Sequence, residues 1–323
     1  MRLIRKWVTA TFLLTFLVIA AGAIVRTTQS GMGCPDWPRC FGMWIPPTNA
    51  SQLPLDFEKY LRVQDIDHTF NVYHTWIEYI NRLLGVLLGI FAIIQLWLLY
   101  KKRHEQPDAF QLARTFLIFV ILTGLFGALV VKFNLAHLSV SVHLLFAFIL
   151  TQIELALLMS VTGKLYKKTA GTKLRKALFI MLLIILAQVI LGTVVRMNVD
   201  DVSKSLGYQQ REAWLSGMPI AFIIHRTFSW FVLFAVLYTS WYCRKVAVLK
   251  VPLQKLTAII LLSMVSGIVL YYLDMPAVAQ PLHLLLAALA ITQIMFTILH
   301  TKNTSDLFKT QGKNSGQEET VAT

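Results

Sequence analysis

Three histidines lie at similar depths within long apolar stretches of this 323-residue sequence. His143 and His283 each follow the start of such a stretch by a few residues, and His225 lies about seven residues, or roughly 10 Å, into another. Ionisable groups are costly inside a membrane and usually face the interior of a helix bundle, where a function holds them. Histidines on facing helices of a bundle are a common means of holding haem iron. The pattern therefore predicts that all three histidines are haem-iron ligands.

The two halves of the sequence repeat short patterns in the same order, at offsets of about 170, 144 and 140 residues. The repeated pairs are GAIVR (22–26) with GTVVR (192–196), INRLLGVLL (80–88) with IHRTFSWFV (224–232), and VHLLFAFILTQI (142–153) with LHLLLAALAITQI (282–294). The repeat pairs His225 with His283 as a bis-histidine site in the second half. The first half should pair His143 with a histidine at position 81, but that residue is Asn81, so the two sites are built differently.

Glu78 lies beside this unusual position. At 100° per residue, His74, Glu78 and Asn81 fall within about 60° of one another on a helix, and this face should look at whatever His143 holds. In the alignment of the two halves Phe222 corresponds to Glu78, so only the first half carries the acid. The sequence therefore predicts one closed electron-transfer site and one site with a carboxyl group and a free axial position.

Three more charged residues fit this scheme, each with an alternative. Arg82 and Arg226 follow the two site positions, where a guanidinium is suited to pair with a haem propionate or to extend toward the membrane surface. Glu154 lies on the same face as His143 and about 16 Å deeper. It marks either a proton or reductant path or a polar group near the cytoplasmic end of its helix.

Two of the three cysteines, Cys34 and Cys40, lie in GCPDWPRC on the predicted outer side, where disulfides persist. This stretch lacks the CxxCH pattern of attached haem, and two cysteines alone cannot close a zinc site. We expect either a short structural disulfide loop or a redox-active pair. Cys243, at a predicted cytoplasmic helix end, is expected to be a reduced bystander.

The composition explains which elements must position these residues. The chain is 56% hydrophobic and 14% charged, with a mean hydropathy of +0.63, which indicates an integral membrane protein rather than a soluble domain. The predicted class is all-α, with eight transmembrane helices in two tandem four-helix bundles that form a parallel internal repeat. The first segment is too long for a signal peptide, and its ending recurs deep in the chain. The eight predicted segments are 7–26, 75–100, 110–132, 138–162, 177–196, 218–243, 256–273 and 280–300.

The net charge of +14 is a topology signal, because lysines and arginines collect in alternate connections and at the ends. This bias places both termini in the cytoplasm and the protein in the cell's inner (cytoplasmic) membrane, with the lipid bilayer and no nucleic acid as a partner. The expected divisions are a first half at 1–163 with an outer loop at 27–74, a second half at 164–301, and a disordered cytoplasmic tail at 302–323. A homo-oligomer is left open.

The sequence resembles the haem A synthase family over about residues 15–300, through GAIVRTTQSGMGCPDWPRCFG, WIEYINRLLG, SVHLLFA, IIHRTFSWFV and PLHLLLA. The resemblance implies two successive oxidations of a ring methyl of haem O, which give the formyl group of haem A for terminal oxidases. It implies haem b on His225 and His283, substrate haem O on His143, and Glu78 as the acid needed for turnover. An enzyme that supplies haem O and an unknown electron donor are implied partners. Cys34 and Cys40 match an outer pair linked to redox support or haem handover.

The family's usual Glu-x-x-His-Arg motif has Asn81 in place of its histidine here. Asparagine is a poor iron ligand, so we expect a five-coordinate haem on His143, with Asn81 donating a hydrogen bond on the open side and His74 as a backup ligand. Two alternative functions are a di-haem electron carrier linked to quinol and a haem-handling assembly factor without turnover. Transport of other solutes fits poorly, because the sequence shows no broken helices at mid-membrane.

The substitution Asn81→His should supply a second axial ligand to the first-half haem and shift its absorption spectrum to a low-spin form. An unchanged spectrum would contradict the five-coordinate hypothesis.

Overall fold

The computed structural model describes residues 1–61, 70–133, 135–165, 168–215 and 220–303. Eight of its helices are long and apolar enough to cross a membrane, which confirms the predicted all-α membrane class. They are α1 (Arg2–Thr27), α3 (Val72–Tyr100), α4 (Pro107–Lys132), α5 (His137–Val161), α6 (Thr172–Ser205), α7 (Ile220–Tyr242), α8 (Ala247–Tyr272) and α9 (Ala279–His300).

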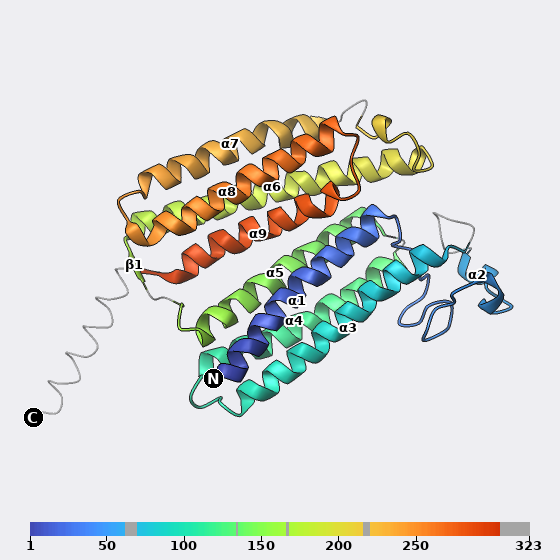
Figure 1. Ribbon diagram of the computed structural model, residues 1–323, viewed down its shortest axis with the longest axis horizontal. Coiled ribbons are helices and arrows are strands. Elements are labelled where there is room, and N and C mark those ends of the chain that lie inside the picture. Colours follow the sequence, from blue (N-terminus) through green and yellow to red (C-terminus); the bar gives the residue numbers. More distant parts are fainter. Residues whose placement is uncertain (62–69, 134, 166–167, 216–219, 304–323) are drawn as a thin grey trace, which may run out of the picture.

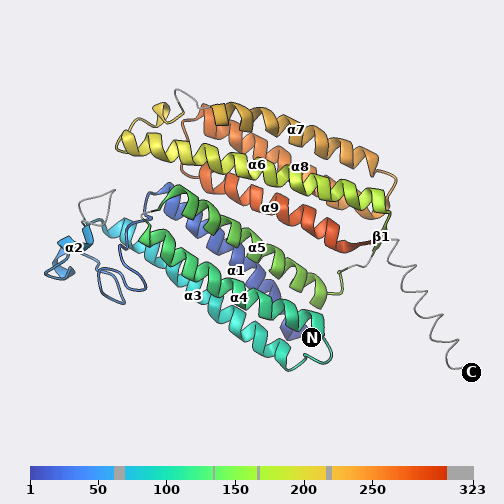
Figure 2. The same cartoon turned by 180° about the vertical axis from the view of Figure 1, so that it is seen from behind.

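The eight long helices form two bundles that lie side by side (Figures 1 and 2). In the first bundle α1 and α4 each pack on α3 and α5, and in the second bundle α6 and α8 each pack on α7 and α9. Helix α9 joins the bundles, because it also packs on α1 and α5. This common packing order is what the predicted internal repeat requires. The internal repeat itself, its symmetry axis, the division at 163 and the cytoplasmic side of the termini stay predictions.

Each bundle has its own apolar core. The second bundle has one continuous cluster, which includes Leu178, Val236, Leu256 and Ile294 of its four helices and extends to Phe148 of α5. The first bundle has two. The inner cluster comprises Ile4, Val8, Leu99, Ala109, Ala113, Leu157 and Val161, and the middle cluster comprises Leu14, Leu88, Ala92, Phe116 and Leu150.

Several helices begin or end away from their predicted residues, and three of them show why. Helix α3 begins at Val72 because the Asn71 side chain accepts hydrogen bonds from the next turn's N–H groups and caps the helix. The predicted end of the fifth segment at 196 was wrong. Helix α6 continues to Ser205, since Arg196 pairs with Asp200 one turn later at 2.8 Å. Helix α8 begins at Ala247 rather than 256 and has Pro252 in its second turn.

Short elements complete the chain. The outer loop holds a 3-10 turn, Ala50–Gln52, and a short helix, α2 (Glu58–Leu61), and a second 3-10 turn spans Arg211–Ala213. Two strands, β1 (Lys168–Ala170) and β2 (Thr301–Asn303), pair in parallel and join the connection after α5 to the chain after α9. The predicted disordered tail therefore begins too early at 302, and residues 304–323 lie outside the described residues.

One carboxylate joins the two bundles near the end that carries the outer loop. Asp200 of α6 pairs with Arg196 of its own helix and with Arg26 of α1, whose Nε lies 3.0 Å from the carboxylate. Arg26 and Arg196 occupy equivalent places in GAIVR and GTVVR. The Arg196 side chain also donates to Gln280 of α9, which in turn donates to the carbonyl of Met275 at 2.9 Å. Two matched arginines from different bundles thus share one acid.

The substitution Asp200→Asn should lower the free energy of unfolding by about 2 kcal/mol, because it leaves two partly buried guanidinium groups without their shared countercharge. Thermal unfolding in detergent measures the loss. The control is Glu105→Gln, which removes an exposed ion pair with Lys102 and should change stability by about 1 kcal/mol at most. Equal effects of the two substitutions would contradict a junction role for Asp200.

Candidate functional site

A glycine on the preceding long helix faces each of the three predicted iron ligands and also Asn81, which occupies the fourth position of the repeat. A Cβ at Gly127 of α4 would lie 3.2 Å from Cε1 of His143, and one at Gly192 of α6 would lie 3.1 Å from Cε1 of His225. Gly267 of α8 faces His283 in the same way at 3.5 Å. The fourth pair is Gly22 of α1 with Asn81 of α3, at 3.9 Å from Oδ1. The lack of a side chain at these glycines lets each ligand side chain lie against the neighbouring helix.

The second bundle brings the His225 and His283 rings together in an edge-on arrangement. Their ring centroids are 6.4 Å apart, with an angle of 73° between the ring planes. The Nδ1 of His283 bonds Ser266 Oγ at 2.7 Å, which leaves its Nε2 for another partner. The backbone carbonyl of His225 accepts from Gln188 at 3.1 Å, while its Nδ1 has no hydrogen-bond partner in the described part of the chain.

These two rings fit a porphyrin iron. A metal–nitrogen bond of about 2 Å plus roughly 1 Å from nitrogen to ring centre places an iron about 3 Å from each centroid, so two axial imidazoles need centroids about 6 Å apart. The distance between His225 and His283 agrees with this value. Across residues 1–61, 70–133, 135–165, 168–215 and 220–303, no group of three His, Cys, Asp or Glu side chains forms a site for a bare metal ion. A porphyrin brings its own four nitrogens and needs only the axial ligands that this bundle offers.

The first bundle offers one imidazole and an amide. The Nδ1 of His143 and the Oδ1 of Asn81 are both buried, and neither has a hydrogen-bond partner among the described residues. Unpartnered buried polar atoms are rare in native proteins and indicate a ligand or a functional role. His74 lies in the first turn of α3, where its carbonyl packs against Gly33 of the outer loop. The backup-ligand role of His74 stays a prediction.

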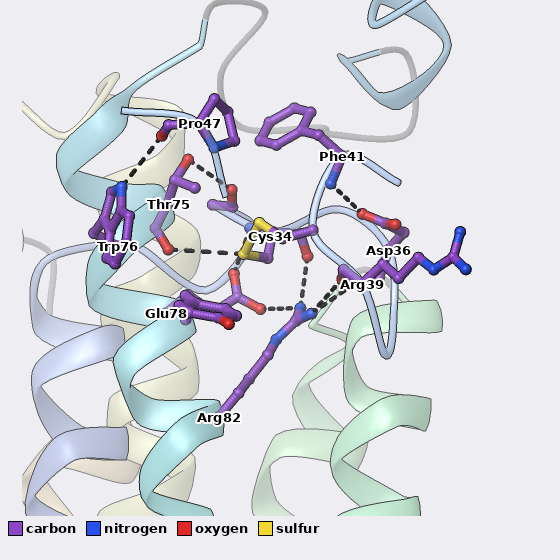
Figure 3. Close-up of a disulfide and its surroundings, with 12 residues drawn as sticks. Cys34, Asp36, Arg39, Phe41, Pro47, Thr75, Trp76, Glu78 and Arg82 are labelled. Atoms are coloured by element: carbon purple, nitrogen blue, oxygen red, sulfur yellow. Dashed lines mark hydrogen bonds and ion pairs between the residues drawn. A yellow bond between two sulfur atoms is a disulfide. The ribbon is translucent and has the colours of Figure 1, made fainter. Parts of the chain in front are cut away.

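Glu78 is held by the outer loop and by Arg82, as Figure 3 shows. The carboxyl group is buried, with the residue only 4% exposed. Its Oε2 accepts a hydrogen bond from the Cys34 backbone N–H at 2.8 Å, and its Oε1 pairs with Arg82 one turn later. The Arg82 guanidinium also donates to the carbonyls of Cys34 at 2.7 Å, Asp36 at 2.6 Å and Arg39 at 3.0 Å. The sequence predicts that Arg82 pairs with a haem propionate or extends toward the membrane surface. Its contacts with the loop were not predicted, because every residue has a backbone carbonyl and the sequence does not show which ones accept.

The disulfide loop covers the first turns of α3. Cys34 and Cys40 form the predicted disulfide, and the two cysteines with Phe41 make a small apolar core for the loop. The Asp36 carboxylate accepts from the backbone N–H groups of Phe41 at 2.6 Å and Gly42 at 2.9 Å. A Cβ at Gly33 would lie 2.3 Å from the His74 carbonyl oxygen, so only glycine allows the loop to approach the helix this closely.

In the second bundle Arg226 corresponds to Arg82, but Phe222 stands where the first bundle has Glu78. The Arg226 guanidinium is exposed and lies over the Phe222 ring, 5.7 Å from its centroid. The residues equivalent to Phe222 and Arg226 in the first bundle are Glu78 and Arg82. The same one-turn spacing therefore gives an ion pair in one bundle and a cation–π contact in the other. The roles of Arg82 and Arg226 at haem propionates stay predictions.

Two predicted residues lie away from these sites. Glu154 is fully buried in the first bundle and bonds Gln95, a partner that the sequence did not reveal. Cys243 is a buried free cysteine at the end of α7, as predicted. Burial raises the pKa of the Cys243 thiol to about 11, which keeps it protonated and unreactive.

This arrangement defines a multi-pass helical membrane protein whose two bundles hold partly buried imidazole side chains near one end. Residues 5–295 match the family model described as cytochrome oxidase assembly protein, and the chain belongs to that family.

Several similar curated proteins are named heme A synthase. The protein of Bartonella quintana is 24% identical over 95% of this chain and 93% of its own length. The protein of Shewanella oneidensis is 29% identical over 56% of this chain and 53% of its own length. The protein of Halalkalibacterium halodurans is 30% identical over 39% of this chain and 36% of its own length. The chain thus spans about half or less of two of these three relatives.

The substitution Gly127→Ala should weaken haem binding in the first bundle roughly tenfold, because the new methyl group forces the His143 ring to move. Haem content of the purified protein, measured by absorption after extraction, tests this. Gly124→Ala on the same helix is the control, since a Cβ there has nothing within 4 Å. Equal haem content in the two variants would contradict the proposed packing role of Gly127.

Proposed function

We propose that this protein is a haem A synthase, which oxidises a ring methyl of haem O to the formyl group of haem A. The single observation that carries the proposal is the juxtaposition of a bis-imidazole pair in one bundle with an imidazole, an amide and a buried carboxyl group in the other. Family membership supports it, and so do the relatives named heme A synthase.

The two bundles divide the work. His225 and His283 would hold haem b, with Ser266 fixing the orientation of the His283 ring. His143 would hold haem O, the substrate, against α4. Haem iron supplies the oxidising chemistry when bound, while the protein supplies orientation and electrostatics. Ligation by both histidines suits electron transfer in the second bundle, and the Asn81 side leaves room for reaction in the first.

Glu78 and Arg82 act together at the substrate. The Cys34 N–H and the Arg82 guanidinium fix both oxygens of the Glu78 carboxylate, so the acid keeps one position during turnover. We assign Glu78 as the group that holds or moves a proton at its carboxyl oxygen, and Arg82 as a positioning residue. The buried amide of Asn81 orients hydrogen bonds on the open side of the substrate.

The membrane setting and the partners follow from the same proposal. The basic connections support a topology in which the helix ends that carry the termini face the cytoplasm and the eight long helices cross the cell's inner membrane. An enzyme that makes haem O supplies the substrate, and the terminal oxidases that contain haem A receive the product. The overall change takes a methyl group and one water to a formyl group, with release of four electrons and four protons. This balance requires an electron acceptor, of unassigned identity, in place of the unknown electron donor that the resemblance implied.

Expression of the chain in cells that make haem O, followed by extraction of the haems, tests the activity. The wild-type protein should yield the formyl product, and Glu78→Gln should abolish it while haem b remains bound. Glu105→Gln, an exposed acid far from the site, is the control and should yield haem A normally.

One outcome would overturn the proposed activity, and another would overturn the role of Glu78 in it. Haem b alone in the wild-type extract would favour a di-haem electron carrier, because such a protein leaves its haems unchanged. Wild-type amounts of haem A from the Glu78→Gln variant would remove the carboxyl group from the mechanism.

A further inference from the structure

A carboxyl group and an amide face each other deep inside the first bundle, away from the haem positions. Glu154 of α5 is 0% exposed and Gln95 of α3 is 1% exposed. The Gln95 Nε2 donates to Glu154 Oε2 at 2.9 Å. The second oxygen of each side chain is also buried, and neither has a hydrogen-bond partner in the described part of the chain. Two acceptor oxygens are therefore left without a donor.

The pair lies between two apolar layers. Along α5, Glu154 falls between Leu150 of the middle cluster and Leu157 of the inner cluster. Gln95 has the same place along α3, between members of the same two clusters. Apolar side chains above and below keep bulk water from hydrating a charge at this level.

No described cation on the surrounding helices pairs with Glu154. Helix α5 packs on α1, α4 and α9 and meets α3 through the Gln95 contact. Charged or titratable groups near this end bond elsewhere: Arg5 of α1 to the Val161 carbonyl, Arg114 of α4 to Gln111, and His300 of α9 to the Lys164 carbonyl. Lys101 after α3 lies over the Trp97 ring. A carboxylate at Glu154 would have one neutral donor and no countercharge.

A proton on Glu154 resolves both unpartnered oxygens. Burying an ionised carboxylate without a countercharge costs several kcal/mol, and such a group takes up a proton instead. The neutral acid then has one O–H donor and one carbonyl acceptor, which complement the carbonyl and NH2 of a primary amide. An acid and an amide satisfy each other in this way, whereas a carboxylate and an amide leave one oxygen of each unpaired.

The pair shares its helix faces with the substrate site. Glu154 follows His143 by eleven residues, so it lies within about 20° on α5 and roughly 16 Å closer to the inner end. Gln95 follows Asn81 by fourteen residues and lies within about 40° on α3. The aligned positions in the second bundle hold Met295 and Thr239, which cannot form such a pair. The acid–amide pair therefore belongs only to the bundle that carries Glu78.

We propose that Glu154 and Gln95 form an internal proton site that serves the first bundle. Glu154 holds an exchangeable proton on one carboxyl oxygen, and Gln95 is its positioning residue. In turnover the Glu154 O–H bond breaks as its proton passes to water at the inner end of the bundle, and the bond re-forms with a proton released at the substrate. No electron moves through the pair. Its use in turnover rests on the proposed function, whose chemistry releases protons inside the membrane. The presence of the bound proton does not depend on that function.

Infrared spectroscopy of the purified full-length protein at neutral pH tests the bound proton. The wild-type spectrum should contain a protonated-carboxyl C=O band that shifts in D2O and is lost in Glu154→Gln. Gln95→Leu should move this band to higher wavenumber, since the carbonyl loses its hydrogen bond. Glu105→Gln should leave the band unchanged. Identical acid-region spectra for wild type and Glu154→Gln would overturn the proposal. If Glu154→Gln fails to fold, as judged by its haem content, the Gln95→Leu shift decides, and an unshifted band overturns the proposal.

Haem A formation tests the use of the proton. Glu154→Gln with normal haem content should form haem A more slowly by about tenfold or more, as expected for loss of a proton-transfer group. A wild-type rate would overturn a role in turnover. A wild-type chain that forms no haem A would fail the proposed function alone, and the infrared measurements would still decide whether Glu154 holds a proton.

Discussion

A polar side chain buried among apolar helices needs a hydrogen-bond partner, and this requirement organises both bundles. The imidazole of His283 meets it through Ser266, and the carboxylate of Glu78 meets it through Arg82 and the outer loop. The Nδ1 atoms of His143 and His225 do not meet it within the described residues. The unpartnered atoms lie where a glycine lets a side chain settle against the next helix. Other unpartnered atoms, those of Gln95 and Glu154, lie deeper in the first bundle, so the imidazoles are distinguished by the facing glycines as well as by their missing partners.

The same scaffold supports two different chemical environments. Both bundles place an arginine one turn after the residue aligned with Glu78, but only the first bundle pairs it with an acid. The disulfide loop lies over the first bundle and supplies a backbone N–H to that acid. The loop thus does more than cover the helix ends, because it fixes the orientation of a buried carboxylate. The asymmetry between the bundles comes from a few side chains and one loop.

The sequence predicts the features that depend on long apolar runs and on repeated spacing. Eight hydrophobic segments specify eight helices, and the matched depth of the histidines predicts the His225–His283 pair. Hydropathy does not predict the extension of α6 to Ser205, because the apolar run ends near Arg196 while ion pairing with Asp200 continues the helix. The sequence does not predict the contacts of Arg82 with the loop carbonyls either, since every residue has a carbonyl. Gly22 and Gly192 are visible in GAIVR and GTVVR, but the sequence does not show which side chain of another helix each glycine faces.

The ion pairs of Asp200 make the stability of one bundle depend on the other. Arg26 belongs to the first bundle, yet its acid belongs to the second. A separately produced first bundle would display a stranded positive charge beside its outermost turn, where lipid or water would have to accommodate it. The converse fragment would retain an acid already matched by Arg196, so it would suffer less. Dividing this polypeptide into independent pieces would therefore harm its N-terminal portion more than its C-terminal one.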